Sequence, residues 1–237
     1  MIIKVCGLRR SDNIRAVEQL GVDFIGMIFY PGSPRYVSMV SSGTGHLPDY
    51  AEKALQPEQM GQDTSSRQLR RAARVGVFVD EMAQQIVSHV VGYGLDYVQL
   101  HGNESVELID NLRLTLDPDI RPGIGFIKAI PVACEADLQK CCEYEGHVDY
   151  FLFDTKCPGH GGSGDKFDWT VLSAYHGRTP FLLGGGIGPE DAEHICSFRH
   201  GRFAGIDLNS CFESEPAMKD IRKLEQFITK IRSHEQD

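Results

Sequence analysis

Short apolar runs, rich in β-branched and aromatic residues, alternate with stretches of helical periodicity along most of this chain. Eight such runs occur, at Ile2 to Cys6, Phe24 to Phe29, Val75 to Val79, Tyr97 to Leu100, Gly125 to Ile130, Tyr150 to Asp154, Phe181 to Leu183 and Phe203 to Asp207. Strands that alternate with helices build a parallel sheet, and eight such units close into a barrel. The pattern therefore predicts an α/β protein with a (β/α)8 TIM-barrel fold.

Helical spacing is clearest in four of the segments between these runs. Ile14, Val17 and Leu20 recur at the period of a helix that Ser11 can cap. The four predicted helices cover Ser11 to Leu20, Met82 to Val91, Pro189 to Cys196 and Ile221 to Ile231. Eight strands and eight helices account for the expected barrel.

At 237 residues the chain has the length of one α/β barrel, so we expect a single domain over residues 1–237. The segment from Ser38 to Ala73 is much longer than a connection with one helix requires. It is rich in Gly, Pro and polar residues, and Leu69 to Ala72 resembles the end of the expected helix. We expect a surface insertion around residues 38–73, with a lid over the substrate as the alternative.

Charge and cysteine content limit the partners. The 33 acidic residues outnumber the 24 basic ones, giving a formal net charge of -9. Such a chain has no general basic field for nucleic acid or an anionic membrane surface, which leaves a small molecule as the expected partner. No apolar run approaches the roughly 20 residues that span a bilayer. Seven cysteines without a CxxC pair or an apolar leader favour a reducing cytoplasm. We expect a monomer or a homodimer.

In a barrel of this kind the active site forms where the strands end. The first run ends in Cys6 and Gly7, the fourth leads into His101, and the sixth ends at Asp154. A thiol and a carboxyl at the ends of two different strands suggest a base and an acid.

Glycine follows the seventh run, and polar residues follow the eighth. Gly184, Gly185 and Gly186 allow backbone N–H groups to approach a phosphate, and Asn209 and Ser210 stand on the neighbouring loop. The two loops together predict a phosphate site. A further cluster, Gly159 to Gly164, resembles a flap beside it, or a loop without ligand contact.

The order of these blocks resembles the phosphoribosylanthranilate isomerase family nearly end to end. The matching blocks are Lys4-Val5-Cys6-Gly7, Phe29-Tyr30 with Ser33-Pro34-Arg35-Tyr36, Val75 to Val79, Gln99-Leu100-His101-Gly102, Phe153-Asp154-Thr155-Lys156, Gly161 to Gly164 with Phe167-Asp168-Trp169, Gly184-Gly185-Gly186 before Pro189-Glu190, and Gly205-Ile206-Asp207 before Glu213. Each block is short, but their order at successive strand ends makes coincidence improbable.

The resemblance implies an Amadori rearrangement of N-(5′-phosphoribosyl)anthranilate without a metal or an organic cofactor. It assigns the general acid to Asp154, the general base to Cys6, and the anthranilate carboxylate to Arg35. The acid must be protonated at neutral pH, so we expect burial to raise the pKa of Asp154. The thiol needs the opposite shift, and Lys4 shares the strand face of Cys6.

Several assignments have alternatives. His101 contacts the substrate or caps the turn after the fourth strand, and Asp207 binds the sugar or the amino group or pairs with Lys4. Lys4 either tunes Cys6 or only pairs with Asp207. The family usually has paired serines and then glycine where this chain has Asn209-Ser210-Cys211, so Cys211 puts the phosphate geometry in question.

Other function classes give different expectations. A Schiff-base aldolase acting on a sugar phosphate would use a lysine at a central strand end, and Lys128 qualifies by position. A metal-dependent hydrolase is disfavoured because the first strand has no His-x-His and the nine histidines are scattered. A non-catalytic barrel that binds a phosphate ligand is the remaining alternative.

Overall fold

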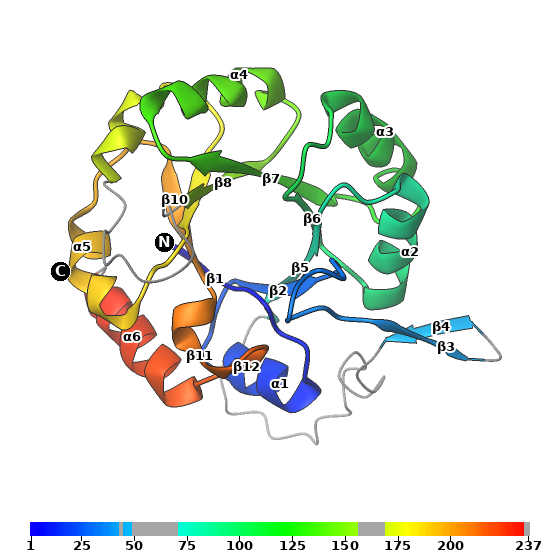
Figure 1. Cartoon of the computed structure of the whole chain (residues 1–237), viewed down its shortest axis with the longest axis horizontal. Coiled ribbons are helices and arrows are strands. Elements are labelled where there is room, and N and C mark those ends of the chain that lie inside the picture. The colour runs from blue at the N-terminus through cyan, green and yellow to red at the C-terminus, as the bar shows by residue number, and fades with distance from the viewer. Residues whose placement is uncertain (43–44, 49–70, 156–168, 235–237) are drawn as a thin grey trace.

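The eight β-rich runs form the eight strands of a closed parallel barrel, in the order β1-β10-β9-β8-β7-β6-β5-β2, seen end-on in Figure 1. The computed structural model describes residues 1–42, 45–48, 71–155 and 169–234. The barrel strands are β1 (Ile2–Val5), β2 (Phe24–Ile28), β5 (Ala73–Phe78), β6 (Tyr97–Leu100), β7 (Gly125–Val132), β8 (Tyr150–Thr155), β9 (Phe181–Gly184) and β10 (Phe203–Leu208). The predicted fold class is confirmed, and each strand lies within two residues of its predicted bounds.

Helices surround the barrel (Figure 1). They are α1 (Ser11–Gln19), α2 (Ala83–Tyr93), α3 (Val106–Leu116), α4 (Cys141–Tyr144), α5 (Ala192–Ser197) and α6 (Ile221–Ser233). In the described ranges, four 3-10 turns cover Glu135–Lys140, Trp169–Ala174, Pro189–Asp191 and Ser210–Phe212. All four predicted helices are present, although Ser11 is the first residue of α1, and the cap position is Arg10, which makes no side-chain cap bond.

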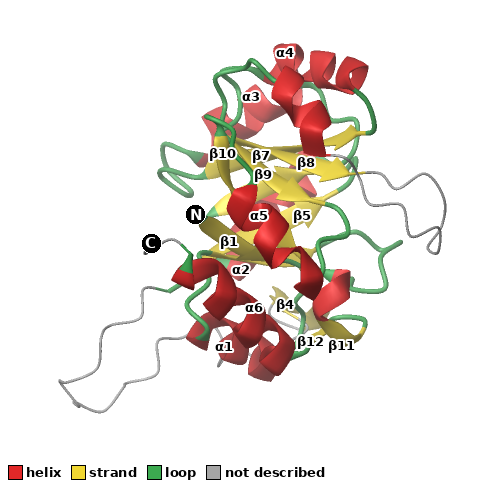
Figure 2. Cartoon of the chain, turned by 90° about the vertical axis from the view of Figure 1, so that its left-hand side faces the viewer, coloured by secondary structure: helices red, strands yellow, loops and turns green. Residues whose placement is uncertain are grey.

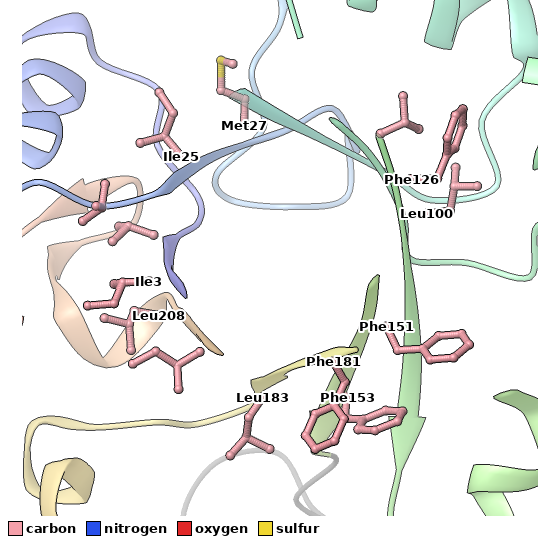
Figure 3. Packing of buried hydrophobic residues seen from close by; sticks show 14 of the residues in the cluster. Ile3, Ile25, Met27, Leu100, Phe126, Phe151, Phe153, Phe181, Leu183 and Leu208 are labelled. Atoms are coloured by element: carbon pink, nitrogen blue, oxygen red, sulfur yellow. The ribbon is translucent and has the colours of Figure 1, made fainter. Parts of the chain in front are cut away.

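The strands bury apolar side chains on both faces. The outer faces meet the helices in a large cluster that includes Ile3, Phe126 and Phe181, shown in Figure 3. The inner faces form a second cluster, with Phe24, Val75, Ile127, Ala129, Leu152 and Leu182 at its centre. Burial of each large side chain stabilises the fold by about 1.5–3 kcal/mol. The inner cluster fills the barrel, so a ligand can reach only its ends.

The segment between β2 and β5 differs from the expected insertion with a terminal helix. Its described part contains an antiparallel hairpin, β3 (Met39–Ser42) and β4 (Gly45–Pro48). Residues 49–70 lie outside the described residues, and Arg71 and Ala72, expected at a helix end, are not helical. The expected glycine-rich flap at 159–164 also lies outside them.

A second hairpin, β11 (Glu213–Glu215) with β12 (Met218–Lys219), follows β10 and lies at the end of the barrel to which the strands point (Figure 2). Asn13 of α1 fixes β12, because its side chain accepts from Lys219 N at 2.8 Å and donates to Lys219 O at 3.0 Å. The hairpin is therefore tied to the barrel beside the C-terminal strand ends. Among the described residues, no helix is long and apolar enough to cross a bilayer.

Candidate active site

A cavity of about 180 Å³ opens at the C-terminal end of the barrel. Nine of the ten predicted site residues line it, namely Cys6, His101, Asp154, Gly184, Gly185, Gly186, Asp207, Asn209 and Ser210. Arg35 is the exception and does not line the cavity. The strand ends thus bring together the thiol, the carboxyls and both predicted phosphate loops.

Cys6 follows β1 and is held in the barrel wall, where its N–H donates to Leu208 O at 2.8 Å. Its side chain is buried, and it fits only because Gly26 faces it, since a Cβ at Gly26 would lie 2.7 Å from the Cys6 Sγ. Burial raises the pKa of the thiol, and the nearby charge of Lys4 lowers it by less. The expected net decrease in the pKa of Cys6 is therefore wrong for the ligand-free protein.

Lys4 and Asp207 form a buried ion pair beneath the cavity. The two residues are register partners on β1 and β10, and the Lys4 Nζ lies 2.8 Å from the Asp207 Oδ2. The expected pairing is therefore confirmed. Burial opposes the charge on Lys4, but Asp207 and Cys6 together outweigh it, so the pKa of Lys4 is raised. Burial also raises the pKa of Asp207, and its Oδ1 has no hydrogen-bond partner within the described part of the chain.

Asp154 faces the cavity from β8 and contacts His101. The Asp154 Oδ2 lies 3.1 Å from the His101 Nε2, and the two side chains are 37% and 34% exposed. The burial expected for Asp154 is therefore not found in the described structure. His101 does not cap its turn with its side chain, because Glu104 accepts from Gly102 N there.

Gln99 was part of the recognised block but had no predicted role. It lines the same cavity, is 1% exposed, and places its Nε2 3.2 Å from the His101 Nδ1. Its position two residues before His101, on the same face of β6, was the available sequence signal.

The two predicted phosphate loops lie side by side on the cavity wall. Gly185 and Gly186 have φ of 80° and 73°, a conformation that favours glycine. The Cys211 Sγ lies 3.6 Å from Gly186 O and thereby links the loops. Among the described residues only Asp80 and Ala217 have positive φ without being glycine, so Cys211 does not need the backbone freedom of the glycine it replaces.

Arg35 lies beside the cavity and is paired with Glu213 of β11. Its Nε and Nη2 donate to the two carboxylate oxygens at 2.8 and 2.6 Å. The Arg35 side chain passes over Gly7, where a Cβ would lie 2.6 Å from the Arg35 Cδ. The hydrogen bond with Glu213 raises the pKa of Arg35.

Glu213 also accepts from the buried Lys219 Nζ at 2.7 Å, and that same ammonium donates to the Asn209 Oδ1 at 2.8 Å. This network of Arg35, Glu213, Lys219 and Asn209 joins the loops after β2 and β10. Lys219 carried no sequence signal, because only the hairpin brings it back to the site.

The chain matches a known family over most of its length. The family profile described as N-(5'phosphoribosyl)anthranilate (PRA) isomerase covers residues 3–230. The chain belongs to this isomerase family. Within the family, the N-(5'-phosphoribosyl)anthranilate isomerase of Parabacteroides distasonis is 50% identical over 231 residues, spanning 98% of this chain and 93% of the relative. The same isomerase from Phocaeicola vulgatus is 44% identical over 232 residues, with 98% of each chain covered.

Solved structures of the isomerase family share the fold. The phosphoribosyl anthranilate isomerase of Thermotoga maritima is 28% identical, with a TM-score of 0.74 and coverage of 98% of this chain and 100% of that one. An isomerase solved in complex with reduced 1-(o-carboxyphenylamino)-1-deoxyribulose 5-phosphate is 26% identical, with a TM-score of 0.72 and the same coverage. The barrel and the family assignment therefore agree.

The position of Lys128 overturns the aldolase alternative. Lys128 is 2% exposed on the outer face of β7, between Ile127 and Ala129 of the inner cluster. Its Nζ donates to the Glu104 Oε2 at 2.9 Å and to Gly102 O at 2.7 Å. An amine held outside the barrel wall cannot reach a substrate in the cavity of this isomerase fold. No group of three His, Cys, Asp or Glu residues that could hold a metal ion occurs in the described ranges.

Proposed function

We propose that this chain catalyses the Amadori rearrangement of N-(5′-phosphoribosyl)anthranilate into 1-(2-carboxyphenylamino)-1-deoxyribulose 5-phosphate, a step of tryptophan biosynthesis. The observation that carries the proposal is the single cavity into which Cys6 and Asp154 both project. The two groups come from strands separated by β10 and β9, so they flank a ligand from different sides. Family membership supports the substrate class.

Asp154 acts as the general acid in the first step. It donates a proton to the ribose ring oxygen, the bond from that oxygen to C1 breaks, and the nitrogen lone pair forms an iminium with C1. Loss of the proton turns Asp154 into a carboxylate, and the His101 Nε2 lies 3.1 Å from its Oδ2. The ring opens without an external electron acceptor.

Cys6 acts as the general base in the second step. Its thiolate removes the proton from C2, and the C–H electrons form the double bond of an enolamine as the iminium nitrogen recovers its lone pair. Tautomerisation to the ketone then oxidises C2 and reduces C1 within one molecule. The substrate nitrogen is the electron sink, so the atoms and electrons balance without another reactant.

Binding is divided among the remaining predicted residues. Gly184, Gly185 and Gly186, with Asn209 and Ser210, hold the phosphate through backbone N–H groups and short polar side chains. The Asp207 Oδ1, which has no partner among the described residues, accepts from a sugar hydroxyl or the amino group, and His101 contacts the substrate from the end of β6. This division is supported by the shared cavity.

Arg35 binds the anthranilate carboxylate at the rim. The Nε and Nη2 of the Arg35 guanidinium donate to Glu213. The Nη1 group is therefore the donor that Arg35 offers to a second anion. In this arrangement Glu213 orients Arg35, and it competes with the substrate for only some of the N–H donors of the guanidinium.

The protein is proposed to work in the cytoplasm as a monomer or a homodimer. The free cysteines of the described chain, six in number, suit a reducing compartment. Sedimentation of the purified protein measures the oligomeric state, and a mass above that of a dimer would contradict this proposal.

The test is turnover of N-(5′-phosphoribosyl)anthranilate by purified, metal-free protein. Cys6→Ala and Asp154→Asn are each expected to lower kcat by about 10²–10⁴-fold and still bind the reduced product analogue. Arg35→Ala is the contrasting variant and is expected to weaken binding of that analogue, because it removes a charged hydrogen-bond donor.

Two results would contradict the proposal. Absence of turnover in the unmutated protein would leave a phosphate-ligand-binding barrel as the better description. Near-normal kcat in Cys6→Ala or Asp154→Asn would remove the assigned acid or base while keeping the activity.

A further inference from the structure

Gln99 is a buried amide that makes one hydrogen bond within the described chain, to a side chain of the site. It is 1% exposed on the inner face of β6, and its Nε2 lies 3.2 Å from the His101 Nδ1. Its Oε1 has no partner among the described residues. A buried polar side chain that leaves an atom unpaired costs free energy. The roles proposed for Asp154 and Cys6 do not explain why the site contains this buried amide.

The two ring nitrogens of His101 face groups of different hydrogen-bonding character. Nδ1 faces Gln99, and Nε2 lies 3.1 Å from the Asp154 Oδ2. Once Asp154 has given up its proton, its carboxylate can only accept, so Nε2 must then carry a proton. In a neutral imidazole Nδ1 must then accept, and only the NH₂ group of Gln99 can donate to it. With Asp154 ionised and the imidazole neutral, one proton arrangement satisfies both bonds.

The backbone around His101 is held separately from its ring. His101 N donates to Phe78 O at 2.8 Å, and Gly102 N donates to both oxygens of Glu104 at 3.0 Å. These bonds fix where His101 leaves β6, but they do not select a tautomer. Within the described structure, that selection depends on the ring's contacts with Gln99 and Asp154.

We propose that Gln99 is a positioning residue that holds His101 in the Nε2–H tautomer, so that His101 donates a hydrogen bond to Asp154 as its carboxylate forms. The inference rests on the acid role proposed above for Asp154. Ring opening leaves a negative charge on a side chain that is 37% exposed. A donor already aimed at this oxygen stabilises the charge without rearrangement, whereas the other tautomer would turn a lone pair toward it.

The same geometry allows a different reading that the experiment must separate. Because Gln99 also lines the cavity, its side chain could bind the substrate directly. Loss of a substrate contact weakens binding, whereas loss of the tautomer slows the chemical step with little change in binding. The proposal therefore predicts an effect on kcat and not on the affinity for the product analogue.

The first measurement is the ¹⁵N spectrum of the histidine rings in the ligand-free, unmutated protein, with the His101 signals assigned from their loss in His101→Asn. At a pH at which Asp154 is ionised, the Nε2–H tautomer is expected, and the Nδ1–H tautomer or an even mixture would overturn the proposal. This measurement needs no turnover. If the protein failed to convert N-(5′-phosphoribosyl)anthranilate, the proposed function would fall, and the spectrum would still decide the tautomer.

The second measurement compares Gln99→Met with Gln84→Met, which makes the same replacement at an exposed position of α2. Gln99→Met keeps the size of the side chain and removes the donor. It is expected to mix the His101 tautomers and to lower kcat by roughly 10–100-fold, the range seen when an orienting partner is lost, with the affinity for the reduced product analogue changed less than about threefold. Gln84→Met is expected to match the unmutated protein. Unchanged kcat in Gln99→Met, or weakened analogue binding with kcat preserved, would overturn the proposal.

Discussion

Opposing effects act on the Cys6 thiol. Burial raises its pKa, and the cations of Lys4 and Lys219 lower it, while Asp207 acts in the same direction as burial. The charge of Lys4 does not act on Cys6 alone, since the Lys4 ammonium lies 2.8 Å from the Asp207 carboxylate. The base strength of Cys6 therefore depends on how the charge of this buried pair is balanced, and not on one activating neighbour.

Replacing Lys4 tests this balance. Lys4→Met removes the nearest cation, so the pKa of Cys6 is expected to rise further and the thiolate fraction at neutral pH to fall. Because the thiolate is the active form of a base, the rate increases with pH, and the alkaline-rising limb of the profile is expected to move to higher pH. A loss of roughly tenfold in kcat at pH 7 corresponds to one pKa unit.

The measurement is kcat against pH together with the ultraviolet absorbance of the thiolate. Lys140→Met, at an exposed position, is the matched control. Full turnover and an unmoved pH profile in a folded Lys4→Met protein would show that Lys4 only pairs with Asp207.

Single residues were predictable where a strand end and a family block coincided. Cys6, Asp154 and Asp207 met that condition, and the cavity contains all three. Glu213 and Lys219 were not assigned, because their contacts with Arg35 and Asn209 arise from a hairpin that returns the chain to the rim. The direction of the Cys6 pKa was also missed, since burial depends on the whole barrel wall.

At the scale of elements, Lys128 shows why the bounds of a strand could be predicted from the sequence, whereas the direction in which each of its side chains points could not. Both faces of a buried parallel strand are apolar. The sequence of β7 therefore does not indicate which of its side chains point into the barrel and which point outward. The fold turns Lys128 outward, where it joins Glu104. Glu104 also accepts from Asp80 N at 2.9 Å, so the pair connects the loops after β5 and β6 with strand β7. The secondary structure of the segment between β2 and β5 could not be predicted either, because its Gly and Pro residues interrupt any periodicity.

Breaking this ion pair is expected to weaken the fold. Lys128→Met leaves the carboxylate of Glu104, whose side chain is 1% exposed, buried without its cation. We expect the free energy of unfolding to fall by about 3–5 kcal/mol. The double variant Lys128→Met with Glu104→Gln is expected to recover part of this loss, because the amide carries no charge yet still accepts from backbone N–H groups.

Urea unfolding monitored by fluorescence measures both variants. Lys128→Met protein that remains folded is expected to bind the product analogue, because the amine lies outside the cavity. A change of less than about 1 kcal/mol, below the cost of a buried unpaired charge, would mean that Lys128 contributes little to the loops it joins.

For the whole molecule, carboxylates with lowered pKa stand at both ends of the barrel. Glu213 lies beside the cavity; burial opposes its charge, but Arg35 and Lys219 outweigh it, so its pKa is lowered. Glu145 lies before β8, at the opposite end, and accepts from the Tyr175 hydroxyl at 2.8 Å and the Thr179 hydroxyl at 3.1 Å. These bonds, together with those from the backbone N–H groups of Thr179 and Arg178, outweigh its desolvation and lower its pKa. Acid therefore weakens the barrel from both ends.

Glu145→Gln tests the contribution of the end that takes no part in the proposed chemistry. The folded-state pKa of Glu145 lies below the value of about 4.3 for an exposed glutamate, so the unfolded chain binds more protons in this range. The stability from its carboxylate is thus fully present above about pH 4.3 and is lost as the pH falls through the folded-state pKa. Since the site is partly exposed, we expect Glu145→Gln to lower the free energy of unfolding at neutral pH by about 1 kcal/mol, and to flatten its decline in acid.

Urea unfolding between neutral and acidic pH measures this, with Glu225→Gln on the exposed face of α6 as the control. An unchanged acid slope in Glu145→Gln would place the acid sensitivity at other carboxylates.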